Sequence, residues 1–303
     1  MNAVAPLVMD TPIDWDAYHL TDDDLARVIT PRSLVEKAQK ILKGGGEFEG
    51  VPLFAKVANE VRLRRGKFHV WGGINHHGKT WLLKQAQLEL VRHGEVVCMA
   101  SLEELPEETF ADIAQQALGM WVNDPGRVQQ VADWLHQKLW LYDQQGMMSA
   151  DRILALMTYC VREYGCTHFI IDSLMRLGVD SEDNEAQRVF ANRLTGHAKA
   201  LNVGIHLVCH IRKQKDETNV PSMMDIKGSG SITDQADAVF VVWRDKRDDR
   251  QQNEPAGILV VEKQRGRPNW IGRIKLWREF STGQFVGACN EEPQWFLPGG
   301  KFR

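Results

Sequence analysis

The stretch that decides the fold is Val-Trp-Gly-Gly-Ile-Asn-His-His-Gly-Lys-Thr, residues 70–80. Its segment Gly73–Thr80 matches the phosphate-binding pattern G-x-x-x-x-G-K-[ST] at every fixed position. The β-branched and aromatic run 68–71 predicts a strand before the loop, and the apolar spacing over 81–90 predicts a helix after it. The motif requires this order, because the loop must point backbone N–H groups and a helix N-terminus at a polyphosphate. A chance glycine-rich turn is the alternative; the context favours a nucleoside triphosphate site.

Each position of this loop has an expected role. Lys79 is expected to reach the β- and γ-phosphates, and Thr80 to hold a Mg²⁺ ion that bridges them. The apolar strand 169–172 ends in Asp172, which in a nucleotide-binding sheet lies beside the phosphate loop and positions the Mg²⁺. The expected ligands are ATP, or another nucleoside triphosphate, and Mg²⁺. The remaining nucleotide-binding positions are Gly73, Ile74, Asn75, His76, His77 and Gly78.

The composition is ordinary for a soluble globular protein. Of 303 residues, 43% are hydrophobic and 25% are charged, enough for one large α/β domain or two small ones. The formal net charge of −3 means that any contact with nucleic acid must come from a local basic patch. The five cysteines mostly lie in apolar runs, which favours buried thiols in a reducing compartment. With no signal peptide and no apolar run long enough for a bilayer, we expect an intracellular protein with no membrane partner.

Beyond the loop, strand and helix patterns alternate along the chain. Helices of about ten to fifteen residues between strands indicate βαβ units and a mostly parallel sheet. After residue 237 the helical patterns stop and strands follow one another, so the sheet should continue into antiparallel strands. The expected fold is an α/β nucleotide-binding core of this kind. The predicted strands are 95–100, 139–142, 169–172, 204–210, 238–243, 257–263, 272–277 and 284–286, and the predicted helices are 106–118, 128–138, 150–164 and 184–201.

The beginning of the chain has a different character. Residues 1–32 are poor in core pattern and are expected to form a flexible arm. Ser33 is expected to cap a short amphipathic helix over 34–42. The glycines at 44–46 then make a flexible joint, so 33–46 is interpreted as a tethered helix before a domain over 47–303. Such a helix either folds back on its own domain or is donated to a neighbour.

Two polar side chains follow strands whose ends should meet the phosphate loop. Glu103 lies just beyond the strand 95–100, where a carboxylate can polarise the water that attacks the γ-phosphate. Glu104 is more simply interpreted as part of a solvated cluster at a helix start. His210 ends the strand 204–210, where it can hydrogen-bond the γ-phosphate. A satisfied core histidine is the alternative for His210.

Two basic segments are candidates for contacts outside the nucleotide site. Arg212, Lys213 and Lys215 follow the strand 204–210, and a polar stretch leads from them to Lys227-Gly228-Ser229. A basic loop with glycine can hold a nucleic-acid backbone through charge and N–H groups, with a solvated loop as the alternative. Further on, Lys263 and Arg265 leave a late strand. Some triphosphate hydrolases take a stabilising arginine from a partner chain, and a solvated basic turn is the alternative.

In this order, the motifs resemble those of the RecA-type hexameric replicative helicases, the group of DnaB, mitochondrial Twinkle and the helicase half of phage helicase–primases. The resemblance covers roughly residues 33–288 and implies a RecA-like P-loop NTPase core. It implies that Glu103 activates water, that Asp172 serves Mg²⁺ and that His210 senses the γ-phosphate. It also makes Lys263 and Arg265 a Lys-x-Arg finger that reaches a neighbour's nucleotide, and 227–232 the close of a DNA-facing loop.

The resemblance also implies a function. It is that of an ATP-dependent DNA helicase that moves 5′-to-3′ on single-stranded DNA as a ring and unwinds duplex at a replication fork. The expected partners are single-stranded or forked DNA, further copies of the chain in a hexameric or similar ring, and a separate primase with other replisome proteins. The helix at 34–42 takes the place of the family's linker helix, which favours donation to a neighbour. The expected location is the cytoplasm of a bacterium or a phage-infected cell.

The sequence departs from the family pattern within the phosphate loop. Asn75-His76-His77 stand where small residues are usual, which makes the path of the loop unusual. Two alternatives remain: a RecA- or KaiC-like DNA-stimulated ATPase, and an ATP-switched helicase loader without unwinding activity. The late position of the Lys-x-Arg pattern fits the first less well. A pure switch has no need of Glu103, His210 and Arg265 together, which argues against the second.

Overall fold

The computed structural model describes residues 28–43, 49–121, 123–179, 183–212, 216–228, 230–247, 249–251 and 253–299. The chain separates into two compact units, Met1–Glu47 and Phe48–Arg303.

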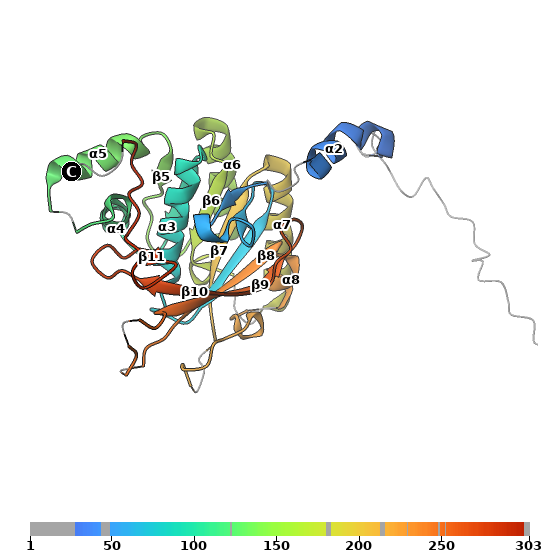
Figure 1. The fold of residues 1–303 in the computed structure, drawn as a ribbon. Helices are drawn as coiled ribbons and strands as arrows, with labels where there is room; N and C mark the ends of the chain where they lie inside the picture. Colours follow the sequence, from blue (N-terminus) through green and yellow to red (C-terminus); the bar gives the residue numbers. More distant parts are fainter. Residues whose placement is uncertain are drawn as a thin grey trace, which may run out of the picture. The chain divides into compact units, whose positions relative to one another are not determined.

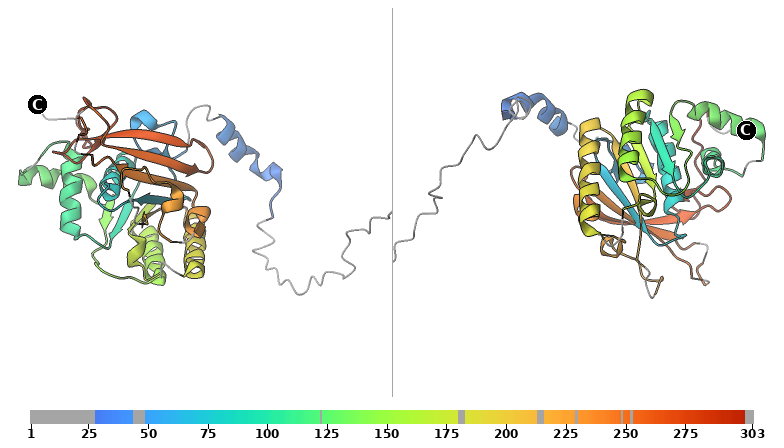
Figure 2. Two further views of the ribbon diagram at one scale, coloured as in Figure 1. Left: turned by 90° about the horizontal axis from the view of Figure 1, so that it is seen from below. Right: turned by 180° about the vertical axis from the view of Figure 1, so that it is seen from behind.

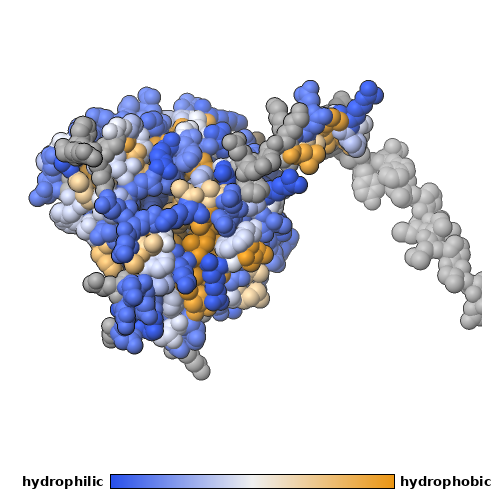
Figure 3. Space-filling view, viewed as in Figure 1, coloured by the Kyte–Doolittle hydropathy of each residue, from blue (hydrophilic) through white to orange (hydrophobic). Residues whose placement is uncertain are grey.

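The described part of the first unit is helical. A 3-10 helix, η2 (Pro31–Leu34), leads into α2 (Val35–Lys43), where a helix over 34–42 was predicted. The predicted cap is wrong, because Ser33 lies inside η2 and its hydroxyl donates to the carbonyl of Thr30 at 2.7 Å. Val35 and Leu42 of α2 are exposed. Figure 3 shows apolar side chains gathered on one side of this helix. The glycine joint and most of the expected arm lie outside the described residues.

The second unit is organised by a nine-stranded sheet, in the order β11-β10-β9-β8-β3-β7-β6-β4-β5 among the described residues (Figure 1). Neighbours from β5 to β8 run parallel, whereas β9, β10 and β11 run antiparallel to theirs. This confirms the expected parallel sheet with antiparallel C-terminal strands. The strands are β3 (Phe68–Gly73), β4 (Val97–Ser101), β5 (Leu139–Leu141), β6 (His168–Asp172), β7 (Gly204–His210), β8 (Ala238–Arg244), β9 (Gly257–Gln264), β10 (Gly272–Arg278) and β11 (Phe285–Val286).

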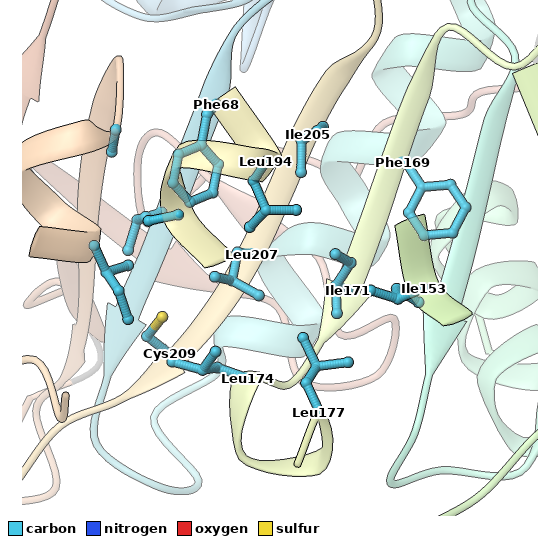
Figure 4. Packing of buried hydrophobic residues seen from close by; sticks show 14 of the residues in the cluster. Phe68, Ile153, Phe169, Ile171, Leu174, Leu177, Leu194, Ile205, Leu207 and Cys209 are labelled. Atoms are coloured by element: carbon cyan, nitrogen blue, oxygen red, sulfur yellow. The ribbon is translucent and has the colours of Figure 1, made fainter. Parts of the chain in front are cut away.

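Helices cover both faces of this sheet (Figures 1 and 2). One face packs on α3 (Lys79–Arg92), α4 (Pro106–Leu118) and α5 (Pro125–Leu135), and the other on α6 (Ala150–Tyr164), α7 (Asn184–Leu201) and α8 (Gly230–Gln235). Side chains alternate between the two cores along each strand, so Ile170 faces α3 and α4 while Phe169 and Ile171 face α6 and α7. Figure 4 shows the second core, with Leu194 of α7 beside Phe68 and Leu207. None of the helices in the described ranges has the length and apolar character needed to cross a bilayer.

Local capping explains where the helix predictions hold and where they fail. Helices α4, α6 and α7 begin and end as predicted; Ser149 caps α6 by accepting from the backbone N–H of Arg152 at 3.2 Å. The prediction for α5 is wrong by three residues at each end, because Asp124 accepts from the Gly126 N–H at 2.9 Å and starts the helix at Pro125. The short helix α8 and the two-stranded sheet of β1 (Val51–Pro52) and β2 (Arg62–Leu63) were not predicted. Short 3-10 helices complete the fold: η3 (Ala55–Val57), η4 (Leu174–Arg176) and η5 (Met223–Asp225).

Three buried histidines lie side by side in the parallel part of the sheet. His69 and His206 stack with ring centroids 4.6 Å apart, and His206 Nε2 lies 3.0 Å from His168 Nδ1. The indole N–H of Trp71 donates to His206 Nδ1 at 3.2 Å, which places the His206 hydrogen on Nε2, facing His168. These hydrogen bonds require neutral rings, because His206 Nδ1 and His168 Nδ1 each accept one. The hydrogen of His168 is then on Nε2, which lies 3.7 Å from Glu95 Oε2. Burial lowers the pKa of all three, for His69 to about 4.

These histidines should make folding stability depend on pH. Because their folded pKa values lie below the ordinary value of 6.5, the unfolded chain binds more protons between pH 6.5 and about 4. The free energy of unfolding therefore keeps its full value above pH 6.5. Below that pH it falls, by up to about 1.4 kcal/mol per pH unit for each histidine. Urea unfolding across this window should show the loss, and His69→Phe should make it shallower. The exposed His136→Gln is the control, and an unchanged slope in His69→Phe would contradict the assignment.

The strand order gathers the predicted site residues at one edge of the sheet. Gly73 at the end of β3 is paired with His210 at the end of β7, and Ser101 at the end of β4 with Asp172 at the end of β6. Since these strands are parallel, their carboxyl ends open on the same crevice, where ligands of such sheets bind.

Candidate active site

The phosphate loop connects β3 to α3 through two glycines that no other residue could replace without strain. A Cβ on Gly73 would lie 2.6 Å from the carbonyl oxygen of Val242 in β8. Gly78 caps α3 with a φ of 92°, a left-handed conformation that favours glycine. The loop therefore leaves the sheet tightly and presents the N-terminus of α3 to the crevice, as an anion site requires.

Lys79 and Thr80 begin α3 and face the crevice. The Lys79 ammonium donates to the carbonyls of Gly73 and Ile74, both at 2.9 Å, so it lies folded over its own loop. Burial lowers the pKa of Lys79, with Asp172 acting in the opposite direction. A phosphate would offer this ammonium a charged partner in place of the two carbonyls, and such charge-assisted bonds are the stronger ones.

The Thr80 hydroxyl donates to Asp172 Oδ2 at 2.7 Å. Burial raises the pKa of Asp172, so a cation beside it would relieve the cost of keeping that carboxylate charged. A hydroxyl and a carboxylate are the oxygen ligands that Mg²⁺ takes when phosphates and waters complete its shell. No cluster of three or more histidine, cysteine or acidic side chains in the described ranges is arranged to cage a metal ion, which suits such an open site. The residues present therefore fit Mg²⁺ at Thr80 and Asp172.

Glu103 lies in a chain of polar side chains beside this pair. Its Oε1 accepts from the Ser173 hydroxyl at 2.8 Å, and His210 Nε2 lies 3.6 Å from the same oxygen. His210 in turn contacts Ser173 Oγ at 3.2 Å and the amide oxygen of Asn75 at 2.5 Å. The contact with His210, followed by that with Ser173, lowers the pKa of Glu103 to about 2. The carboxylate is therefore ionised at neutral pH and is linked to the phosphate loop through His210 and Asn75.

Glu104, by contrast, is held by the scaffold. The ammonium of Lys84, whose side chain is completely buried, lies 2.6 Å from Glu104 Oε2 and 2.6 Å from Asp112 Oδ2. Thr109 contacts the same Glu104 oxygen at 3.3 Å. A buried lysine between two carboxylates ties the start of α4 to α3, so Glu104 stabilises the site wall while Glu103 faces the crevice. The two neighbouring acids therefore have different roles, which the sequence could distinguish only by their positions after the strand.

These groups line one open cavity of about 520 Å³. Its cations are Lys79 and two arginines that the sequence analysis missed, Arg244 at the end of β8 and Arg278 at the end of β10. Strand pairing explains why both arginines lie at this cavity. Arg244 is paired with Gly257, and Gly257 is paired in turn with Leu276, two residues before Arg278. The full lining is Asn75, His76, Gly78, Lys79, Thr80, Trp81, Glu103, Glu104, Asp172, His210, Arg244 and Arg278.

The two arginines pack against aromatic rings, and together they form one wall of the cavity. Arg278 lies 4.9 Å from the ring centroid of Trp81 and 5.4 Å from that of Phe280, and Arg244 lies 5.8 Å from the latter. Burial and the neighbouring Arg244 lower the pKa of Arg278. Its buried Nε has no hydrogen-bond partner in the described part of the protein. Two adjacent arginines, one with a buried N–H that no described residue accepts, favour an anion at this wall, and the flat wall suits a nucleobase or ribose.

The structure does not bring every predicted residue to this cavity. The ring of His77 turns away from it and is buried against β8. Lys263 and Arg265 lie at the opposite end of the sheet, since Gln264 is paired with Ala238 at the start of β8. Both contact α8: Lys263 Nζ donates to the carbonyls of Thr233 and Asp234 at 2.8 Å, and Arg265 Nη2 to that of Asp234 at 2.9 Å.

The basic loop after β7 leaves and returns at the crevice edge. Ile211 and Ile226 form an antiparallel bridge at its base, and the Lys227 N–H donates to the carbonyl of His210 at 2.7 Å. Arg212 is exposed and its guanidinium lies 3.3 Å from the carbonyl of Gly228. The other predicted DNA contacts, Lys213, Lys215 and Ser229, lie outside the described residues. The base of the basic loop, which the structure describes, is therefore joined directly to His210 at the crevice.

A phosphate loop, an oxygen-ligand pair and an ionised glutamate at the carboxyl edge of one parallel sheet define a RecA-like P-loop fold. The sequence model of the DnaB-like helicase C-terminal domain matches residues 61–286. The chain belongs to this family.

Curated relatives agree with this placement. A DNA helicase/primase of Enterobacteria phage T3 is 25% identical over 200 residues, which cover 59% of this chain and 35% of the relative. The replicative DNA helicase DnaB of Treponema pallidum (strain Nichols) is 28% identical over 169 residues, which cover 54% of this chain and 36% of the relative. The chain spans about a third of the length of these relatives.

Solved structures show the same fold. A structure described as an ATPase domain has a TM-score of 0.72 at 19% identity and covers 84% of this chain and 97% of its own. A DnaB-like replicative helicase, solved in work on its interactions with primase, has a TM-score of 0.72 at 19% identity and covers 87% of this chain and 69% of its own. At this identity the likeness shows the fold alone, and that fold is the RecA-like ATPase core predicted from the sequence.

Proposed function

We propose that the chain is the motor of an ATP-dependent DNA helicase that moves along single-stranded DNA as a ring and unwinds duplex at a replication fork. The observation that carries this proposal is the ionised Glu103, linked through Ser173 and His210 to the phosphate loop. A protein that only binds nucleotide has no need of a carboxylate held in this way beside the Mg²⁺ ligands. Membership of the DnaB-like family supports it.

In this mechanism the crevice holds the triphosphate with its γ-phosphate near Lys79 and the N-terminus of α3. Glu103 orients the attacking water and accepts its proton, for which it must be ionised, as it is at neutral pH. Mg²⁺, held by Thr80 and Asp172, would neutralise the charge on the phosphates. His210 touches both Glu103 and Asn75, so loss of the γ-phosphate would alter its contacts directly.

The same histidine connects hydrolysis to DNA. His210 is followed by Arg212 and the basic loop, which we assign to the phosphates of single-stranded DNA, with Lys213, Lys215, Lys227, Gly228 and Ser229. Contacts of this kind hold the backbone and do not read bases. The direction of movement, 5′-to-3′, follows from family resemblance.

The ring is supported by two features. Arg265 lies at the far end of the sheet from its own cavity, where its guanidinium can serve a neighbour. Helix α2 has an exposed apolar side, which we assign to the adjacent subunit (Figure 3). Because one structural neighbour was solved in work on its interactions with primase, and one curated relative is named a helicase/primase, we include a primase among the proposed partners.

Turnover and unwinding assays test this function. Wild-type protein should hydrolyse ATP faster with single-stranded DNA and should separate a forked duplex, losing that activity when the tail on which it loads is removed. DNA-stimulated hydrolysis without unwinding, even with a supplied loader and primase, would favour a RecA- or KaiC-like ATPase. No turnover at all would favour an ATP-switched loader.

Charge removal from the basic loop tests the DNA contact. Replacing Arg212, Lys213 and Lys215 together with alanine should weaken binding of every single-stranded sequence. It should also make log Kd less dependent on log salt, by about 0.7 in slope for each phosphate that the protein no longer neutralises. Fluorescence anisotropy with labelled oligonucleotides at several salt concentrations measures both quantities. Lys199→Ala, on the exposed C-terminal turn of α7, is the matched control; an unchanged slope in the triple variant would move the DNA site elsewhere.

A further inference from the structure

His77 belongs to the phosphate loop but does not line the cavity. The side chain of His77 is completely buried, and its Nδ1 accepts from the backbone N–H of Arg244 at 2.9 Å. That bond places the ring hydrogen on Nε2, which lies 3.5 Å from Glu217 Oε2. Burial, with Lys246 second, lowers the pKa of His77 to about 4, so the ring is neutral at neutral pH. The phosphate loop thus presents a buried neutral N–H, without a hydrogen-bond partner in the described part of the protein, that faces a carboxylate on the basic loop at 3.5 Å.

Glu217 is fixed on its own side of this contact. Its carbonyl accepts from the indole N–H of Trp243 at 2.9 Å, and its carboxylate lies 3.2 Å from Lys246 Nζ. Asp216 braces the turn by accepting from the Thr218 N–H at 2.9 Å and from the Asn219 amide at 3.2 Å. The carboxylate is half exposed, and it lies between the buried His77 ring and solvent on the loop that starts at Arg212.

We propose that Glu217 is a positioning residue that couples the basic loop to the phosphate loop through His77. The inference rests on the proposed function, in which this loop contacts the phosphates of single-stranded DNA. A DNA backbone beside this loop would repel the Glu217 carboxylate and compete for Lys246. The disturbance would reach His77 and, through its bond with the Arg244 backbone, the strand end that carries the Arg244 side chain into the nucleotide cavity.

Coupling of this kind is reciprocal, so it can be measured by binding alone. The measurement is the Kd for a labelled single-stranded oligonucleotide with and without a non-hydrolysable ATP analogue, and the ratio is the coupling factor. Glu217→Ala should reduce this factor roughly threefold to tenfold. It should not weaken DNA binding in the absence of nucleotide, because it removes a carboxylate that repels the backbone, and it should leave the thermal unfolding temperature unchanged. A merely structural role would instead lower both the affinity for DNA and that temperature. Glu217→Gln keeps the size of the side chain but removes the charge that the DNA backbone would repel, so it should reduce the coupling factor as Glu217→Ala does.

Two further variants sharpen the test. Glu254→Ala removes another exposed carboxylate, one that contacts Arg247 and Gln251, and should leave the coupling factor unchanged. Adding His77→Ala to Glu217→Ala should reduce the factor no further than Glu217→Ala alone, because both act through one contact. Full coupling in Glu217→Ala, or additive losses in the double variant, would overturn this inference and leave the proposed function standing. A wild-type protein that does not bind single-stranded DNA would overturn the proposed function itself.

Discussion

Glu103→Gln should retain nucleotide binding and lose ATP turnover by at least about 10²-fold, the loss expected when a general base is removed. The amide is nearly the same size as the carboxylate and keeps an oxygen for the Ser173 hydroxyl, so the polar chain to the phosphate loop survives. It has no charge with which to accept a proton from water. The defect should therefore appear in kcat, while affinity for the triphosphate stays near the wild-type value.

Lys79→Ala gives the contrasting result. Here the ammonium that would hold the phosphates is gone, so binding of a fluorescent nucleotide and turnover should fall together. Glu107→Gln, which changes an exposed acid on the first turn of α4, is the matched control and should behave like wild type. Normal turnover in Glu103→Gln, with DNA present, would remove Glu103 from the role of base and direct attention to Glu104.

The sequence was sufficient for the parts of the site that local patterns specify. A glycine-rich loop between a strand and a helix, and an apolar strand ending in Asp172, need no knowledge of distant segments. Helices with strong caps, such as α6 after Ser149, could be placed to the residue. The DnaB-like family match over 61–286 confirms the resemblance inferred from the order of the motifs.

What sequence reasoning missed depends on strand pairing and side-chain direction. Arg244 and Arg278 are far apart in the chain, and they meet only because β8, β9 and β10 form consecutive antiparallel pairs. Ser173 carries no pattern of its own, and it matters because β6 ends beside Glu103. The direction of the His77 ring follows from one backbone N–H on β8, which no local motif encodes. For Arg244 and Arg278, the sequence did offer one signal: each arginine stands directly after the end of a predicted late strand.

Arg265→Ala should reduce ATP turnover by about 10³-fold or more, the usual loss when an arginine finger is removed. Within its own chain the residue cannot act on the nucleotide: it follows β9 at the end of the sheet opposite the phosphate loop, and its guanidinium contacts the carbonyl of Asp234. Its side chain is exposed there, ready for a neighbouring subunit. A head-to-tail contact between this surface and the nucleotide crevice is one that can close into a ring.

Mixing two inactive variants distinguishes action on a neighbour from a structural role. In mixed rings of Arg265→Ala and Lys79→Ala subunits, an interface with an intact Lys79 on one side and an intact Arg265 on the other can hydrolyse ATP. At equal amounts and random assembly, about one interface in four is of this kind, so a comparable fraction of activity should return. Mixing Lys79→Ala with Glu103→Gln should restore nothing, because both residues belong to the same subunit's cavity. If mass measurements confirm mixed rings and Arg265→Ala recovers no better than this control, Arg265 does not serve the neighbour's site, and the ring need not assemble through it.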